Sequence, residues 1–153
     1  MKIHTSITIV LLSLLVFTTK AQELDKATVQ SLIDSGSFVF RAQTMIPAGG
    51  NSRHLTASYD VRVTKDSLTT YLPYAGRAYT GVLPGEAGIN FNSSEFDYKA
   101  SFKKKKWSIS IKPKDSNPVK ELNFIVFENG SSTLVVYPLN KQPITYYGYL
   151  KKN

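Results

Sequence analysis

The fold class is decided by the stretch Leu55-Thr56-Ala57-Ser58-Tyr59-Asp60-Val61-Arg62-Val63, in which every second residue is apolar. Successive side chains of a β-strand point to opposite faces of its sheet. This alternation therefore predicts a strand with one face in the protein core and the other in water.

The same two-residue period recurs on both sides of that stretch, from Phe38 to the end of the chain. Strands are predicted at residues 38–42, 55–63, 67–72, 89–91, 96–102, 107–111, 122–127, 132–137 and 143–150. Residues 73–88 hold two prolines and four glycines, so we expect a long irregular connection there. Asn129-Gly130 between two apolar runs predicts a type I′ hairpin, whose two central residues need positive φ.

A short helix is predicted before the first strand. Asp25 can cap it, and Val29, Leu32 and Ile33 share one face at helical spacing before Gly36 ends it. The strands are joined mostly by hairpins, which favours a mainly β fold. We expect an antiparallel meander in a curved sheet or barrel-like domain, with the helix over one end or face. A two-sheet β-sandwich is the alternative.

Residues 1–21 have the pattern of a signal peptide. Lys2 precedes an apolar run at residues 7–17, and Thr19 and Ala21 are the small residues expected before a cut ahead of Gln22. The alternatives are a buried N-terminal helix or a retained anchor. The chain has no cysteine, so no lipid can be attached to one after the cut. We expect export to the periplasm or the medium, without stable membrane insertion, and a single domain at residues 22–153.

Charge argues against a nucleic-acid partner. The full chain carries a formal charge of +8, and removal of Lys2 and Lys20 leaves 17 basic residues against 11 acidic ones. Four of these cations are consecutive at Lys103–Lys106, and Lys151 and Lys152 lie in the tail. Such bunched charge is typical of a solvated turn and tail, and the lysines are expected to keep a hairpin tip soluble.

Few residues could support metal or nucleophilic chemistry. After loss of the leader, His54 is the one histidine, and without cysteine the usual ligand sets for zinc, copper or haem are missing. We therefore expect no metal site and no cofactor. His54 has no serine elbow motif to work with, and a calcium site at Asp115 and Asn117 has equally little support.

Two carboxylates could hydrolyse a glycoside if they flank the bond. Glu95 and Asp97 lie two residues apart and therefore share a strand face, but Phe96 and Tyr98 alternate with them as core residues would. That pattern predicts a solvent face. A carboxylate-dependent hydrolase is retained as an alternative function, and no catalytic residue is assigned.

The best candidate for ligand binding is the segment Leu72-Pro73-Tyr74-Ala75-Gly76-Arg77-Ala78-Tyr79, at the exit of a predicted strand. Arg77 could hold a carboxylate or phosphate through parallel hydrogen bonds while Tyr74 and Tyr79 stack on a ring or sugar. In the structural alternative, the tyrosines seal the rim of the core and Arg77 pairs with a neighbouring carbonyl or acid.

A second aromatic group lies on the last predicted strand. Alternation places Tyr147 and Tyr149 on one face and Tyr146 on the other, with Gly148 allowing a bulge or a close approach. We expect these rings to pack at an edge of the sheet. Exposed rings there would instead offer a surface to a protein partner.

The order of these motifs resembles that of the exported bacterial family catalogued as domain of unknown function 4251. The resemblance covers the mature chain, and its specific part is the segment from Leu72 to Tyr79. The other matching motifs are generic strand patterns, at Phe38–Ala42, Asn129-Gly130 and the closing residues 144–148. It implies an exported, compact β domain and brings no catalytic residue.

The predicted function is a non-enzymatic exported binding or accessory module, with Tyr74, Arg77 and Tyr79 at the site. Its partner would be a small ligand, a glycan or a protein. The scarcity of groups that titrate near neutral pH favours binding over catalysis. The alternatives are the hydrolase and a protein-interaction module that uses an exposed edge strand.

Overall fold

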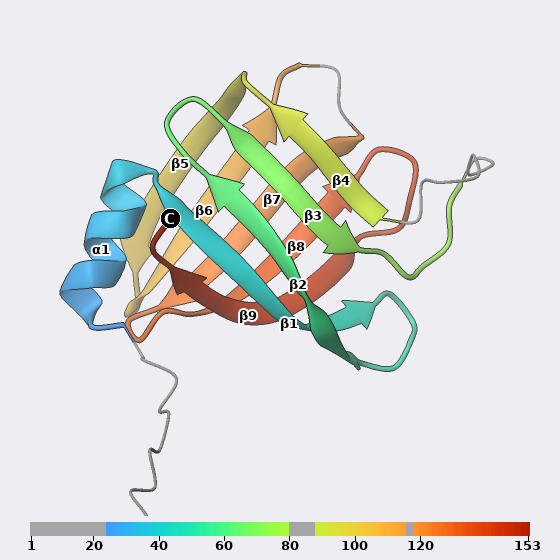
Figure 1. Cartoon of the computed structure of the whole chain (residues 1–153), viewed down its shortest axis with the longest axis horizontal. Coiled ribbons are helices and arrows are strands. Elements are labelled where there is room, and N and C mark those ends of the chain that lie inside the picture. Colours follow the sequence, from blue (N-terminus) through green and yellow to red (C-terminus); the bar gives the residue numbers. More distant parts are fainter. Residues whose placement is uncertain (1–23, 80–87, 116–117) are drawn as a thin grey trace, which may run out of the picture.

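The structure, a computed structural model, describes residues 24–79, 88–115 and 118–153 as one helix and nine strands (Figure 1). The elements are α1 (Lys26–Ser35), β1 (Phe38–Pro47), β2 (Arg53–Val63), β3 (Leu68–Pro73), β4 (Gly88–Ser93), β5 (Phe96–Lys103), β6 (Lys106–Pro113), β7 (Val119–Phe127), β8 (Ser131–Pro138) and β9 (Ile144–Lys151). Every neighbouring pair is antiparallel, in the order β4-β3-β2-β1-β9-β8-β7-β6-β5.

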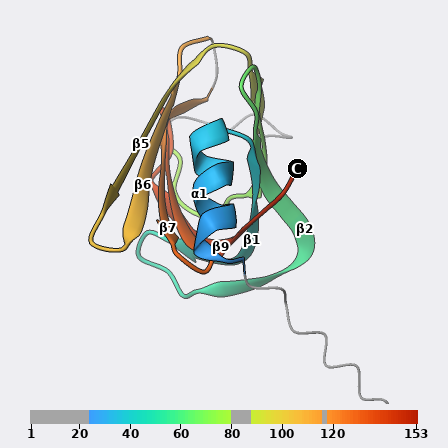
Figure 2. The ribbon, with the colours of Figure 1, turned by 90° about the vertical axis from the view of Figure 1, so that its left-hand side faces the viewer.

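This one sheet curls into a nearly closed barrel. Strands β1 to β4 form one wall and β5 to β8 the other, and β9 curves between the two walls (Figures 1 and 2). The two edge strands, β4 and β5, follow each other in sequence with only Ser94 and Glu95 between them. The predicted barrel-like meander is confirmed, and the two-sheet alternative is not what forms.

The core lies inside the barrel because alternate residues of each strand point inward. Phe38 and Phe40 of β1 meet Phe124 of β7 edge to face, with ring centroids 5.8 and 5.7 Å apart. All three rings are buried. Since β1 and β7 are not neighbours in the sheet, these rings join the two walls across the interior, and burial of each contributes roughly 1.5–3 kcal/mol.

Helix α1 lies between the two walls at the open side of the barrel (Figure 2). As predicted, Asp25 caps its start by accepting a hydrogen bond from Thr28 N, and Gly36 ends it at φ +61°. Val29 and Ile33 are fully buried. The hydroxyl of Tyr98, on edge strand β5, donates to the carbonyl of Ile33 at 2.8 Å and fixes the helix to that wall. The described residues contain no helix with the length and apolar character to cross a bilayer.

The pairing of β1 with β9 holds the tightest backbone contact in the sheet. The register of β1 shifts between Ala42 and Thr44 against both of its neighbours, so Gln43 forms a β-bulge. Gly148 lies opposite Ala42, and a Cβ at this glycine would overlap the carbonyl oxygen of Arg41. A bulge increases strand bending and twist, and here the curvature needs a glycine in the facing strand.

Strand β9 is therefore an interior strand, and the expectation that its tyrosines pack at a sheet edge is wrong. The predicted alternation itself is confirmed: Tyr146 is fully buried, whereas Tyr147 and Tyr149 are 49% and 39% exposed. The early half of β2 also departs from its pattern, because Ala57 is exposed. Strand β3 supports β2 only from Asp60 to Val63, so the preceding residues extend beyond the core.

The type I′ turn forms at a different hairpin from the one predicted. Between β7 and β8 only Gly130 has positive φ, in a three-residue turn where the side chain of Asn129 accepts hydrogen bonds from Ser131 N and Oγ. Asn129 is thus used as a turn acceptor and keeps a negative φ. The two-residue turn with positive φ at both positions is Lys104-Lys105, between β5 and β6.

Replacing Gly148 with alanine should destabilise the fold by more than about 3 kcal/mol, because the added methyl group overlaps backbone that cannot move without breaking the β1–β9 pairing. Urea unfolding followed by circular dichroism measures the effect. Gly50→Ala is the matched control, since its Cβ would meet nothing closer than 3.4 Å, and it should change stability by less than about 1 kcal/mol. Equal midpoints for the two variants would contradict the proposed role of Gly148.

Candidate functional site

The segment Tyr74–Tyr79 is held against the connection between β8 and β9, on the right in Figure 1. Ala78 forms a β-bridge with Lys141, Tyr79 N donates to the carbonyl of Asn140 at 2.9 Å, and Gln142 N donates to the carbonyl of Arg77 at 3.1 Å. Two segments more than sixty residues apart therefore lie side by side at this end of the sheet.

Two tyrosine hydroxyls anchor the start of this segment. Tyr146 donates to the carbonyl of Pro73 at 2.6 Å, and the hydroxyl of Tyr74 lies 3.0 Å from the carbonyl of Gln142 and 3.1 Å from that of Arg77. Burial raises the pKa of both phenols above the usual value. A Cβ at Gly76 would come within 2.5 Å of the Tyr74 hydroxyl, so a larger residue there would push the Tyr74 ring out of place. Tyr74 is thus fixed by the framework.

Arg77 and Tyr79 are held through their backbones, while their side chains are exposed, Tyr79 to 68%. The structure therefore separates the three predicted site residues. Tyr74 is held in the framework, as in the structural alternative in which the tyrosines seal the rim of the core, and it also lies next to a pocket. Arg77 and Tyr79 lie at the surface beside it. A ligand role for Tyr74, Arg77 and Tyr79 stays a prediction.

A pocket of about 240 Å³ opens next to this segment. Its lining comes from the start of β4, the start of β7 and the connection from β8 to β9: Gly88, Ile89, Asn90, Pro118, Val119, Pro138, Asn140 and Lys141. Lys141 joins the pocket to the tyrosine segment. Its Nζ lies 5.1 Å from the centre of the Tyr74 ring and 3.5 Å from the carbonyl oxygen of Gly88.

The pocket combines one cation, two side-chain amides and an apolar wall. Lys141 supplies positive charge, Asn90 and Asn140 can donate or accept hydrogen bonds, and Ile89 and Val119 are buried apolar residues. Concave sites of this composition bind small ligands by apolar contact and use a few polar groups for orientation. The sequence could not indicate this pocket, because its residues come from separate segments and form no local motif.

The candidate carboxylate pair is arranged for solvent. Asp97 forms an ion pair with Lys114 at 2.7 Å, and the hydrogen bond from Lys114 lowers the pKa of this carboxyl. Both Glu95 and Asp97 are exposed. A lowered pKa is the opposite of what a general acid needs, so the geometry gives Asp97 no acid role.

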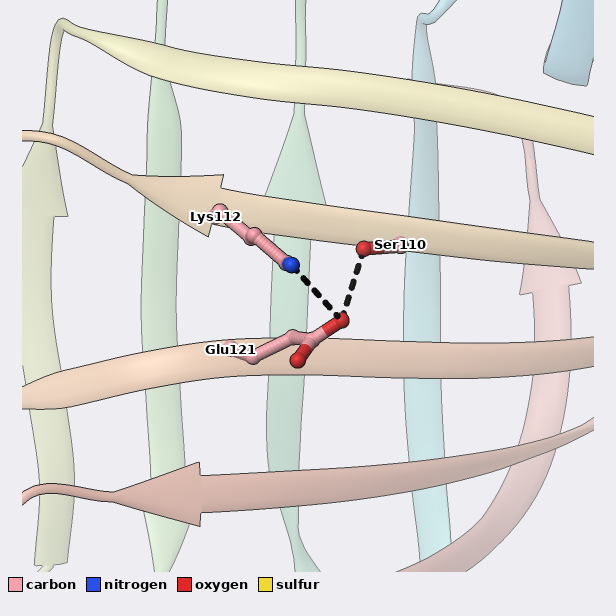
Figure 3. A network of polar contacts seen from close by, with 3 residues as sticks. All are labelled: Ser110, Lys112 and Glu121. Carbon is pink, nitrogen blue, oxygen red and sulfur yellow. Dashed lines mark hydrogen bonds and ion pairs between the residues drawn. The ribbon is translucent and has the colours of Figure 1, made fainter.

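Figure 3 shows a network of polar contacts around one carboxylate, on the outer face of β6 and β7. Glu121 Oε1 accepts a hydrogen bond from Ser110 Oγ at 2.8 Å and lies 3.9 Å from Lys112 Nζ. These contacts link two neighbouring strands. Glu121 is the one carboxylate among these three residues, whereas a general acid and base pair needs two.

The remaining candidate residues that the structure describes, His54 and Asp115, lie apart from one another. His54 is exposed on β2, and the carboxylate of Asp115 accepts hydrogen bonds from Ser93 Oγ and Ser94 N at the corner between β4 and β5. Asn117 lies outside the described residues. Within the described ranges, no three histidine, aspartate or glutamate side chains gather in a way that could hold a metal ion.

Comparison with known proteins identifies the family. The family model described as domain of unknown function (DUF4251) matches residues 20–150. The chain is also similar to the crystal structure of a DUF4251 family protein from Bacteroides eggerthii DSM 20697, at 18% identity and a TM-score of 0.64, over 86% of this chain and 90% of that one. That likeness concerns the fold. No curated protein matches the chain.

Substituting Tyr146 with phenylalanine should cost about 1–3 kcal/mol at pH 7, because the buried carbonyl of Pro73 loses its donor. The pH dependence should change as well. The folded pKa of Tyr146 lies above the unfolded value of 10.0, so its contribution is complete below about pH 10 and is lost as the unfolded chain ionises at higher pH.

The variant should therefore lose less stability than the wild type between about pH 9 and pH 11.5, as measured by urea unfolding at each pH. Tyr147→Phe is the control, since the hydroxyl it removes belongs to a ring that is 49% exposed. Parallel pH profiles for the wild type and Tyr146→Phe would show that this phenol does not hold the segment in the way described.

Proposed function

The chain belongs to the family of domain of unknown function 4251, and from that premise we propose that it is an exported, non-enzymatic binding module for a small organic anion. The ligand occupies the pocket beside Lys141. Tyr74 positions this lysine, and Arg77 and Tyr79 contact the part of a ligand that extends past the rim.

The observation that carries the proposal is the position of Lys141. Lys141 lines a pocket together with two asparagines, Asn90 and Asn140, and two apolar residues, Ile89 and Val119. A carboxylate or phosphate meeting Lys141 gains a charge-assisted hydrogen bond, while the remaining atoms of the ligand displace water from apolar wall.

The surroundings of Lys141 support this role. The face of the Tyr74 ring lies toward the ammonium group, and the Tyr74 hydroxyl is fixed by the carbonyls of Arg77 and Gln142. A cation above an aromatic ring is held by the negative face of that ring. Lys141 is therefore oriented before a ligand arrives, which lowers the entropy cost of binding.

Size and charge narrow the ligand class. A pocket of about 240 Å³ is below the range of drug-sized sites, so it suits a small molecule or one end of a larger molecule. The basic excess of the sequence attracts anions over long range. The proposed export rests on the signal-peptide pattern of residues 1–21, which lie outside the described residues, and the mass of the protein recovered after secretion tests the predicted cut before Gln22.

A thermal-shift screen with small carboxylates and phosphates, each paired with an uncharged analogue such as its methyl ester or amide, tests the proposal. A ligand at a hundredfold excess over its Kd should stabilise the protein by about 2.7 kcal/mol, whereas its uncharged analogue should stabilise it much less.

Lys141→Gln should weaken a ligand found in this way by roughly tenfold to a hundredfold, as expected for loss of a charge-assisted hydrogen bond. Lys120→Gln is the matched control, because Lys120 is exposed on β7 next to the pocket residue Val119 but does not line the pocket. An anion site at Lys141 would be refuted if charged ligands and their uncharged analogues stabilised the protein equally. It would also be refuted if both variants lost the same affinity for the ligand.

A further inference from the structure

The tip of the β5–β6 hairpin concentrates positive charge at one point of the surface. Lys103, Lys104 and Lys105 are exposed, Lys106 is partly exposed, and Lys103 and Lys106 face each other as the last strand pair. Among the described residues, none of these four lysines forms an ion pair with an acid, whereas Lys26, Lys112 and Lys114 each do. The hairpin tip therefore concentrates four positive charges, three of them on exposed side chains.

The backbone of this tip is unusual for lysine. Lys104 has φ +54° and Lys105 has φ +59°, and they are the two non-glycine residues with positive φ in the described chain. The left-handed region favours glycine and asparagine, and the type I′ turn formed here is most often Asn-Gly. Strained residues of this kind concentrate at functional sites.

Exposed phenylalanine rings flank the same tip. Phe102, next to Lys103, is 48% exposed and packs on Trp107 with ring centroids 4.6 Å apart. Phe127 is 44% exposed and lies opposite Lys106 on the neighbouring strand. Lysine ammonium groups beside phenylalanine rings suit the boundary between charged headgroups and acyl chains, where the cations meet anionic lipid and the rings leave water.

We propose that the β5–β6 tip, Phe102–Lys106 together with Phe127, docks the protein on the surface of an anionic phospholipid bilayer. Charge complementarity selects the partner, and the rings favour lipid over a hydrated anionic polymer because acyl chains remove their apolar surface from water. Protection of the β5 edge against pairing accounts for Lys99 and Lys103 along the strand. It does not account for two lysines in the turn itself.

Docking at this tip leaves the proposed anion pocket accessible. Val119, which lines the pocket, begins β7, and Phe127 ends the same strand beside the tip. The segments that line the pocket, at the starts of β4 and β7 and in the β8–β9 connection, are on the right in Figure 1, and the tip is at the lower left, so the two surfaces lie at opposite ends of the sheet. Membrane docking stands on its own observations and is independent of ligand binding in the pocket.

Vesicle sedimentation tests the docking. The protein recovered after export should bind vesicles of phosphatidylglycerol and phosphatidylcholine in equal parts, bind pure phosphatidylcholine far more weakly, and release as salt is raised. The sole tryptophan, Trp107, reports contact, because spin-labelled lipid should quench its fluorescence when the tip meets the bilayer.

The double variant Lys104→Asn with Lys105→Gly removes two charges and gives the turn its favoured residues. It should melt at a higher temperature than the wild type, yet bind anionic vesicles about 25-fold more weakly, since each lysine near such a surface contributes roughly fivefold. Phe127→Thr should also weaken binding. The control, Arg62→Gln with Lys65→Gln, removes the same charge near the β2–β3 turn, on the other wall of the barrel, and should bind almost as the wild type does.

Weaker binding and quenching in both tip variants, with little change in the control, would establish the docking surface. Three results would overturn it: no preference for anionic vesicles, an equal loss in the control, or tighter binding to dextran sulfate than to the vesicles. If the double lysine variant melts below the wild type, vesicle binding by Phe127→Thr decides the test, because this variant leaves the turn intact.

Discussion

The close contact between Gly148 and the backbone of Arg41 allows the sheet to curl into a barrel. Opposite the bulge at Gln43, it lets β9 approach β1 without a side chain between them, and the sheet curves there from one wall to the other. Only in the curved sheet do Phe38 and Phe124 meet across the interior. The curl also brings the β4 and β7 ends close enough to line one pocket.

Local patterns predicted most of the fold. The two-residue period identified the strands, and Asp25 and Gly36 fixed both ends of the helix, because burial and capping depend on neighbours in sequence. The position of β9 inside the sheet was missed, since strand order depends on contacts between distant segments. The type I′ turn was assigned to Asn129-Gly130, where the asparagine side chain serves as a turn acceptor, and it formed at two lysines instead.

The candidate site could be predicted only in part. The segment with Tyr74 was recognisable because rings, a cation and a glycine gather within eight residues. Lys141 and Asn90 carried no signal, since they reach the pocket through pairing between segments that are far apart along the chain. The basic tip shows the converse: the lysines were visible in sequence as a solvated turn, but their left-handed backbone and the flanking rings required coordinates.

Amide hydrogen exchange followed by NMR measures how strongly the β1–β9 pairing holds the barrel. If the bulged β1–β9 pairing holds the barrel together, amides of β1 and β9 on either side of Gln43 and Gly148 should exchange only through global unfolding, while those of edge strands β4 and β5 exchange faster through local opening. Exchange at the β1–β9 pairing as fast as at the two edges would contradict the account, because the sheet would then keep its curvature without this contact.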